Sequence, residues 1–225
     1  MDKNLITQII RSNRRTLALQ IAPDASLIVR APKRVSEKTI LIFIQKKIKW
    51  ILRHQKLARE SYRPSVKREF ADGEEFLYLG DGHLLFVSQD VTHPLVFHEK
   101  KFLLSASFLP KAKHLFEQWY RKQAYEVIKE RVRLYAETAG LRFKRIAITG
   151  ARKRWGSCGP TGTLNFSWRL IMAPLLVIDY VIVHELAHLE ERNHSRRFRE
   201  KVRLLFPNHQ QAEKWLQANS WLLNW

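Results

Sequence analysis

Alternating and helix-like patterns of apolar residues outline the first third of the chain. Residues 16–21 and 26–30 alternate apolar with polar side chains and flank a turn-forming stretch, residues 23–25, which together predict a β-hairpin. From Ser36 onward, apolar residues recur every three or four positions, and this spacing predicts a helix over residues 36–60 with Ser36 as its cap.

The pattern changes twice in the middle of the chain. Turn-forming residues separate four short β-rich segments, which predict a small antiparallel β lobe: residues 76–79, 84–88, 95–98 and 102–105. After Pro110, an amphipathic pattern continues to Gly140 and predicts one long helix. The shift near Leu109 therefore predicts two domains, residues 1–108, a β-rich lobe with one helix, and residues 109–225.

The last part of the chain combines strands with helices. Three alternating segments predict strands at residues 145–149, 152–157 and 163–170, with a turn at residues 158–162 between the last two. Residues 175–183 are apolar almost all round, which predicts a buried helix in which Asp179 is either capped or ion-paired within the frame and not catalytic. Two amphipathic helices over residues 195–205 and 210–222 complete an α+β fold.

Composition limits the class of protein. The chain has 225 residues, 45% of them hydrophobic, and a net charge of +19, which predicts attraction to phosphates, nucleic acid or acidic surfaces. A single cysteine excludes an intrachain disulfide and is typical of a reducing cytoplasm. No signal-peptide pattern is present in residues 1–19, and the apolar run at residues 170–183 is too short for a bilayer, so we expect a cytoplasmic protein without a membrane anchor.

The string His184-Glu185-Leu186-Ala187-His188 ends the predicted buried helix. Four residues are just over one helical turn, so both imidazoles project from one face, about 6 Å apart along the axis, and can share a metal ion. Glu185 lies about 100° round the helix, where it can reach a water on that metal without being a ligand. Histidines that only hydrogen-bond to the core are the simpler alternative, but such groups at core depth are costly without a metal or charged partners.

A third histidine, His194, follows six residues after His188. In a continuous helix it would point about 240° away from His188, so metal binding requires the helix to end between Leu189 and Asn193. Asn193 tolerates the left-handed conformation and is the expected point of reversal. In a helix Glu191 shares the face of the first two histidines, and it stays an alternative ligand or a residue that orients one.

Three imidazoles leave the fourth tetrahedral position of a zinc ion open, as in catalytic sites and unlike the closed shell of structural ones. Zinc would lower the pKa of a water bound there to about 7, and Glu185 can then take its proton and pass it to a leaving group.

Several segments together resemble one known family, the YgjP-like metallopeptidases, which are bacterial relatives of the SprT-like and zincin metalloproteases. The resemblance is carried by Arg154-Trp155-Gly156-Ser157-Cys158, by residues 165–170 and 178–188, and by Asn193-His194-Ser195 with Phe198. It implies a zincin-like catalytic lobe over residues 109–225. It also implies zinc bound by His184, His188 and His194, with Glu185 as the general base.

By analogy with zincins, the strand at residues 163–170 would lie beside the active-site helix and hold an extended peptide by strand addition. One face of this strand carries Asn165 and Ser167, which makes these residues candidate substrate contacts. Arg152 and Arg154 can stabilise developing negative charge or bind a phosphate, or they are solvated charges at a strand edge.

Three functions fit these features. The leading one is zinc-dependent hydrolysis of peptide bonds in a peptide or protein. A second keeps the metal site but cleaves a nucleotide or another phosphoanhydride, because basic clusters flank the motif on both sides. A third is a nucleic-acid-associated protein with a SprT-like protease role, recruited by its charge. A purely structural metal site fits worst, because three ligands and a glutamate leave an open position.

Overall fold

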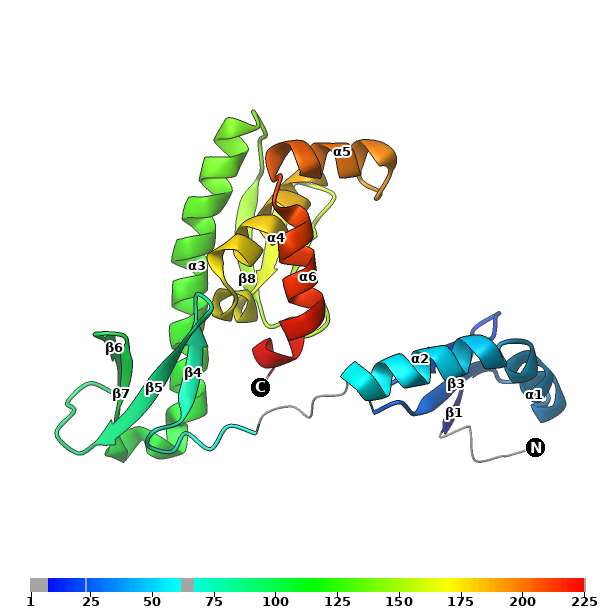
Figure 1. Cartoon of the computed structure of the whole chain (residues 1–225), viewed down its shortest axis with the longest axis horizontal. Coiled ribbons are helices and arrows are strands. Elements are labelled where there is room, and N and C mark those ends of the chain that lie inside the picture. Colours follow the sequence, from blue (N-terminus) through cyan, green and yellow to red (C-terminus); the bar gives the residue numbers. More distant parts are fainter. Residues whose placement is uncertain (1–7, 23, 62–66, 225) are drawn as a thin grey trace. The chain divides into compact units, whose positions relative to one another are not determined.

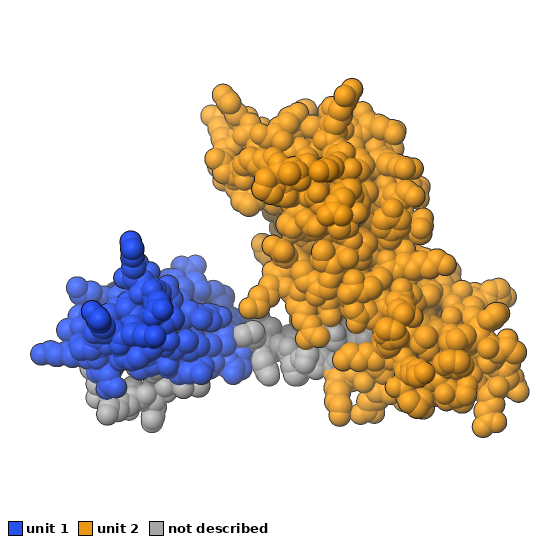
Figure 2. Space-filling view, turned by 180° about the vertical axis from the view of Figure 1, so that it is seen from behind, with its two compact units in different colours: residues 1–64 blue, residues 65–225 orange. Residues whose placement is uncertain are grey.

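A computed structural model gives the fold, and it describes residues 8–22, 24–61 and 67–224 (Figure 1). The chain forms two compact units, Met1–Pro64 and Ser65–Trp225, which Figure 2 colours separately. Each unit has its own cluster of buried apolar side chains. The boundary therefore falls about 44 residues earlier than the predicted division between residues 108 and 109.

Unit 1 is a three-stranded sheet with two helices. Its strands are β1 (Gln8–Ser12), β2 (Ala18–Ile21) and β3 (Leu27–Pro32), in the order β1-β3-β2, and its helices are α1 (Glu37–Lys46) and α2 (Ile48–Ser61). The antiparallel pairing of β2 with β3 confirms the predicted hairpin, although Pro23 of its turn lies outside the described residues. The hydroxyl of Ser36 accepts a hydrogen bond from the amide of Thr39, which confirms the predicted cap. The single helix predicted here is wrong, because the helix is interrupted at Lys47.

Unit 2 begins with a four-stranded sheet in the order β4-β5-β7-β6. Its strands are β4 (Glu75–Tyr78), β5 (Asp81–Ser88), β6 (Leu95–His98) and β7 (Lys101–Ser105). The predicted strands are present, but the predicted antiparallel lobe is wrong, because β5 and β7 run parallel. After the 3-10 helix η2 (Ala106–Lys111), the chain enters the long helix α3 (Ala112–Thr138).

Aromatic packing explains why these strands are not a separate lobe. The rings of Phe76 on β4 and Phe116 on α3 stack with centroids 4.2 Å apart, and Phe102 on β7 packs against both. All three side chains are fully buried. The sheet therefore shares its core with α3 and cannot be divided from it at residue 108.

A second small sheet and the remaining helices complete unit 2. The strands β8 (Arg145–Thr149), β9 (Gly156–Cys158) and β10 (Thr163–Ser167) lie in the order β8-β10-β9, with β10 parallel to β8 and antiparallel to β9. They are followed by η3 (Trp168–Met172), α4 (Leu175–Ala187), α5 (Arg196–Leu205), α6 (His209–Asn219) and η4 (Ser220–Leu223). The predicted α+β class is confirmed: a small mixed sheet accompanies a buried helix.

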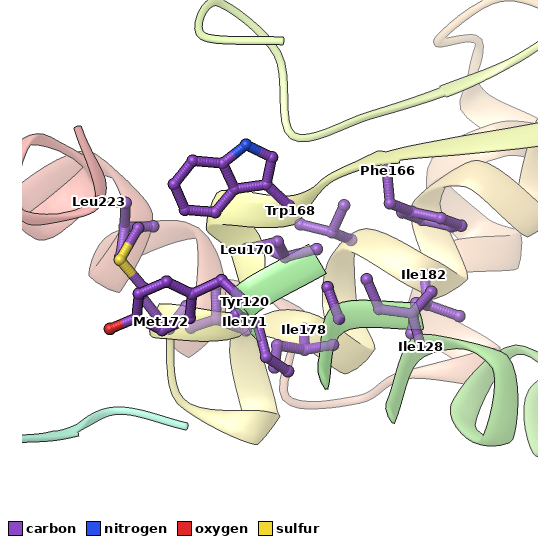
Figure 3. Packing of buried hydrophobic residues seen from close by; sticks show 14 of the residues in the cluster. Tyr120, Ile128, Phe166, Trp168, Leu170, Ile171, Met172, Ile178, Ile182 and Leu223 are labelled. Atoms are coloured by element: carbon purple, nitrogen blue, oxygen red, sulfur yellow. The ribbon is translucent and has the colours of Figure 1, made fainter. Parts of the chain in front are cut away.

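Helix α4 lies inside unit 2 and contacts α3, α5, α6 and β9. Val177 through Val183 are all buried, as the apolar run predicts. Figure 3 shows Ile178 and Ile182 packed among residues of α3 and η3, with the large ring of Trp168 nearby. Each such aliphatic side chain contributes about 1.5–3 kcal/mol when fully buried, so α4 is held mainly by its own hydrophobic surface.

The start of α4 is fixed by a close approach between two turns. The amides of Leu79 and Gly80 donate to the carbonyls of Ile171 and Met172, at 2.9 and 3.2 Å, which joins the β4–β5 turn to η3. Gly80 has φ +94°, and a Cβ there would lie 2.8 Å from the side chain of Pro174, the residue that caps α4. Only glycine fits this position.

Among the described residues, no helix is long and apolar enough to cross a membrane.

Asp179 forms the predicted ion pair within the frame. Asp179 is 5% exposed, and its carboxylate accepts two hydrogen bonds from Arg131 of α3, from Nε at 2.7 Å and from Nη2 at 2.5 Å. This fork-shaped contact ties α4 to α3 in the middle of an otherwise apolar interface.

We expect Asp179→Ala to destabilise the protein by about 3–5 kcal/mol in urea unfolding, because it leaves the Arg131 guanidinium without its buried partner. The matched control is Glu200→Ala, which removes an exposed pair with Arg196 and should cost less than about 1 kcal/mol. The double variant Arg131→Met/Asp179→Leu should recover most of the loss. Equal losses of unfolding free energy in Asp179→Ala and Glu200→Ala would show that the buried pair contributes no more to stability than the exposed one.

Candidate metal centre

The chain reverses direction directly after α4. The helix ends at Ala187, and His188 is its cap, so the end lies earlier than the predicted interval between Leu189 and Asn193. The amides of Leu189 and Glu190 bond to carbonyls three residues back, at 3.0 and 3.3 Å, which tightens the last turn. Asn193 is not among the described residues with positive φ, so the left-handed reversal predicted there is wrong.

Arg192 holds the segment that follows. Its guanidinium donates to the carbonyls of Gly159 and Pro160, at 3.1 and 2.9 Å, in the turn between β9 and β10. A second tie is the ion pair of Glu190 with Lys201 on α5. Because these contacts join the segment to two neighbouring elements, His194 returns to a defined place.

The structure brings together the three histidines that the sequence singled out. One ring nitrogen from each of His184, His188 and His194 lies within 4.8 Å of the others, and the Nε2 atoms of His184 and His194 are 3.1 Å apart. The ring of Phe198 on α5 packs against all three imidazoles, with centroid distances of 4.9, 4.5 and 4.7 Å. Phe198 is buried, and its amide donates to the capping hydroxyl of Ser195, so the first turn of α5 positions this support.

These donors fit a tetrahedral metal ion such as zinc. Zinc–imidazole bonds of about 2.0–2.1 Å place ligand nitrogens roughly 3.3 Å apart, close to the 3.1 Å between the Nε2 atoms of His184 and His194. The Nδ1 of His188 donates to the carbonyl of Glu191 at 2.9 Å, because a carbonyl can only accept, and this leaves the lone pair on Nε2. The carboxylate of Glu191 is not part of the group, so Glu191 contributes its backbone to the site.

Burial makes two of the imidazoles good metal ligands. It lowers the pKa of His184 to about 4, and the neighbouring His188 and His194 act in the same direction. Burial also lowers the pKa of His188. Both rings are therefore neutral at pH 7, and no proton has to be displaced before a cation binds.

Glu185 is buried beside the histidines, with 6% of its surface exposed. Burial raises the pKa of its carboxyl to about 7, while the backbone amide of Cys158 and the charge of Arg154 act in the opposite direction. The carboxylate lies directly against β9: a Cβ on Gly156 would lie 2.6 Å from its Cγ and Oε1 atoms. The glycine of the Trp-Gly-Ser-Cys segment therefore makes room for the glutamate of the motif.

The four residues that the sequence predicts as substrate contacts divide into two buried or half-buried polar side chains and two exposed arginines. Ser167 is buried and donates to the carbonyl of Ala151 at 2.7 Å, and Asn165 donates to the carbonyl of Ser157 at 3.2 Å, so both side chains bind the protein itself. Arg152 and Arg154 are exposed. The positive charge of Arg154 lowers the pKa of Glu185, and that of Arg152 lowers the pKa of the buried Arg169.

Strand addition at β10, as predicted, is excluded by the order of the sheet. β10 is the central strand, with β8 on one edge and β9 on the other, so neither of its edges is open. The strand that contacts α4 is the edge strand β9.

Two residues of the site were missed by sequence reasoning. The close contact between Gly156 and the Glu185 side chain was not predicted, although a glycine inside a predicted strand indicates that another group approaches the backbone closely. Tyr180 lies one turn before His184, and its ring meets that imidazole edge-on at 5.9 Å. Its hydroxyl donates to Glu213 of α6 at 2.8 Å, which links the site to the last helix. The spacing of four residues from His184 was the available signal.

Three converging imidazoles could hold a metal ion, and a buried carboxylate lies beside them, which is the set of groups that metal-dependent hydrolysis requires. A family model described as YgjP-like, metallopeptidase domain, matches residues 15–219, so the chain belongs to the YgjP-like metallopeptidases. The family makes this protein a metal-dependent peptidase.

One solved structure is similar over part of the chain, the metallopeptidase zymogen jannalysin of Methanocaldococcus jannaschii. The identity is 22%, the match covers 39% of this chain and 90% of jannalysin, and the TM-score is 0.36. A similarity of this size does not define a shared fold. No curated protein matches the chain.

We expect Gly156→Ala to lower peptidase turnover by about 10²-fold, since a shift of about 1 Å in a reacting group can cost that much. The added methyl group must displace the Glu185 carboxylate, whereas the histidines are untouched, so metal content should stay at the wild-type level. The matched control is Gly159→Ala in the same hairpin, where the nearest atom is 3.4 Å from the added Cβ. Metal content is measured on the same samples. Wild-type turnover in Gly156→Ala would contradict the role of Gly156 in positioning Glu185.

Proposed function

We propose that this protein is a zinc-dependent peptidase in which His184, His188 and His194 hold the metal and Glu185 is the general base. The observation that supports this most strongly is the convergence of three imidazole nitrogens within 4.8 Å, two of the rings being kept neutral by burial. The family supports a metal-dependent peptidase, and the donor set favours zinc, because neutral imidazoles are ligands that zinc prefers.

A zinc ion held by the three histidines would supply Lewis acidity, which would lower the pKa of a water molecule toward neutrality and polarise the carbonyl of the substrate. Glu185 takes the proton of the attacking water onto its carboxylate and delivers it to the leaving amine. With a pKa of about 7, set mainly by burial, this carboxyl group is suited to both halves of the transfer near neutral pH. A cation beside it favours the ionised form that the first half requires.

Three features of the chain keep these groups in position. Gly156 and the Cys158 amide hold Glu185 from the side of β9. Phe198 supports the imidazoles, and the carbonyl of Glu191 fixes the tautomer of His188. Arg154 is exposed, and its positive charge is close enough to lower the pKa of Glu185. It is therefore our candidate for stabilising the negative charge that develops on the substrate.

Nucleotide hydrolysis and nucleic-acid association stay predictions from charge. One observation weakens the first: Arg192, one of the basic residues that flank the motif, binds the β9–β10 turn and is not available to a phosphate. Another observation favours nucleic-acid association: unit 1 contains fifteen lysines and arginines and only four acidic residues. Such a density of charge attracts polyanions without reading their sequence.

We expect Glu185→Gln to reduce hydrolysis of an unstructured protein substrate by about 10²–10⁴-fold, the range that one general base supplies. Zinc content should stay unchanged because all three imidazoles remain. Glu191→Gln is the matched control, since it alters a neighbouring carboxylate but keeps the backbone carbonyl that His188 uses. Phosphate release from a nucleotide panel that Glu185→Gln abolishes, without any peptide cleavage, would favour the phosphoanhydride alternative.

We expect His194→Ala to bind zinc far more weakly than the wild type, because two imidazoles on one helical turn are an incomplete ligand set. Zinc content after dialysis against a weak chelator measures this directly. Full occupancy in His194→Ala together with loss of zinc in Glu191→Gln would assign the third ligand to Glu191 instead.

A further inference from the structure

A cavity of about 330 Å³ lies directly beside the metal centre, between α4, α5 and α6. His184 and His194 line it, so a group placed in the cavity is next to any substrate bound at the histidines. Its volume is at the lower end of the range for ligand pockets, about 300–1,000 Å³, which suits one side chain or chain terminus and not a folded surface.

Three side chains of the cavity lining are buried and mainly apolar. Phe198 and Val202 of α5 are buried there, and Tyr180 of α4 presents its ring. The one carboxylate in the lining, Glu213, already accepts the hydrogen bond from the hydroxyl of Tyr180. The stem of a substrate side chain can therefore pack against these buried side chains while its polar end reaches the rim.

The rim is positively charged. Arg199 and Arg203 lie one turn apart on α5, and neither makes an ion pair or hydrogen bond with any described residue, whereas the neighbouring Arg196 and Lys201 are both paired. Nδ1 of His209, which also lines the cavity, is buried and has no hydrogen-bond partner in the described part of the chain. His209 is the first residue of α6, where the backbone dipole also favours a negative charge.

We propose that this cavity binds a carboxylate of the peptide substrate close to the cleaved bond, with Arg199 and Arg203 as its partners. The proposal rests on the proposed function and adds a preference in the substrate. Two guanidinium groups that have no partner among the described residues, in the lining of a cavity whose buried side chains include Phe198 and Val202, attract an acidic group and repel lysine or arginine. The carboxylate belongs either to a glutamate or aspartate side chain or to the C-terminus of the peptide.

The first measurement compares peptides that differ only next to the cleaved bond, with glutamate, glutamine or lysine there, on either side of the bond. Glutamate and glutamine have the same shape, so their ratio of kcat/KM isolates the charge. We expect the wild type to favour glutamate by roughly fivefold or more, which corresponds to one favourable ion pair. Arg199→Glu/Arg203→Glu should reverse the order and favour lysine. Arg197→Glu is the matched control, an exposed residue of α5 outside the cavity lining that should keep the preference.

The second measurement reads binding without turnover. Fluorescence anisotropy of labelled peptides with the Glu185→Gln protein should show the same preference for glutamate and its loss in the arginine double variant. Amidation of the C-terminus distinguishes the two sources of the carboxylate: if only amidation weakens binding, the cavity holds the chain terminus, and if only the glutamine exchange does, it holds a side chain.

The outcomes separate this proposal from the proposed function. Cleavage of all peptides at equal rates, with no effect of amidation, overturns the cavity proposal and leaves the peptidase intact. Binding preference without any cleavage by the wild type overturns the proposed function and supports a carboxylate site. Competition by inorganic phosphate or nucleotides, but not by acidic peptides, overturns the assignment of the cavity to a peptide carboxylate.

Discussion

The burial of α4 is the constraint on which the rest of unit 2 depends. This helix is apolar on nearly every side, so it is stable only where other elements cover it completely. α3, α5, α6 and the edge strand β9 supply that cover, and the Asp179–Arg131 pair is the polar contact that fixes α4 against α3. His184, Glu185 and His188 stand at the end of this helix, so the positions of these three residues follow from the packing of the core.

The same burial sets the chemistry of the site. Removing His184 from water lowers its pKa and keeps it neutral, whereas removing Glu185 raises its pKa toward neutrality. One physical cause thus yields a ready metal ligand and a carboxyl group able to exchange a proton. A fully solvated glutamate has a pKa of about 4.3 and would be ionised near neutral pH. An active site at the end of a buried helix is therefore prepared for its reaction by the fold.

Local spacing made part of this structure predictable. The positions of His184, Glu185 and His188 on one helical turn follow from helix geometry, and the caps at Ser36 and Gly140 follow from residue preferences. The errors concern distant pairing. Neither the parallel pairing of β5 with β7 nor the central place of β10 is encoded in the alternation of a single strand, because alternation fixes which side chains share a face and not which strand lies alongside.

Contacts between distant segments also decided the parts of the site that the sequence did not reveal. Arg192 was one of many basic residues in the sequence, yet it binds the β9–β10 turn and thereby holds the segment that returns His194. Phe198 supports all three imidazoles and at the same time forms the wall of the neighbouring cavity. The three histidines and the proposed carboxylate site therefore share one side chain, so a movement of α5 that reshapes the cavity also moves the support of the histidines. If both proposals hold, we expect substrate preference and metal geometry to be coupled through this ring, because a packed core moves as connected pieces.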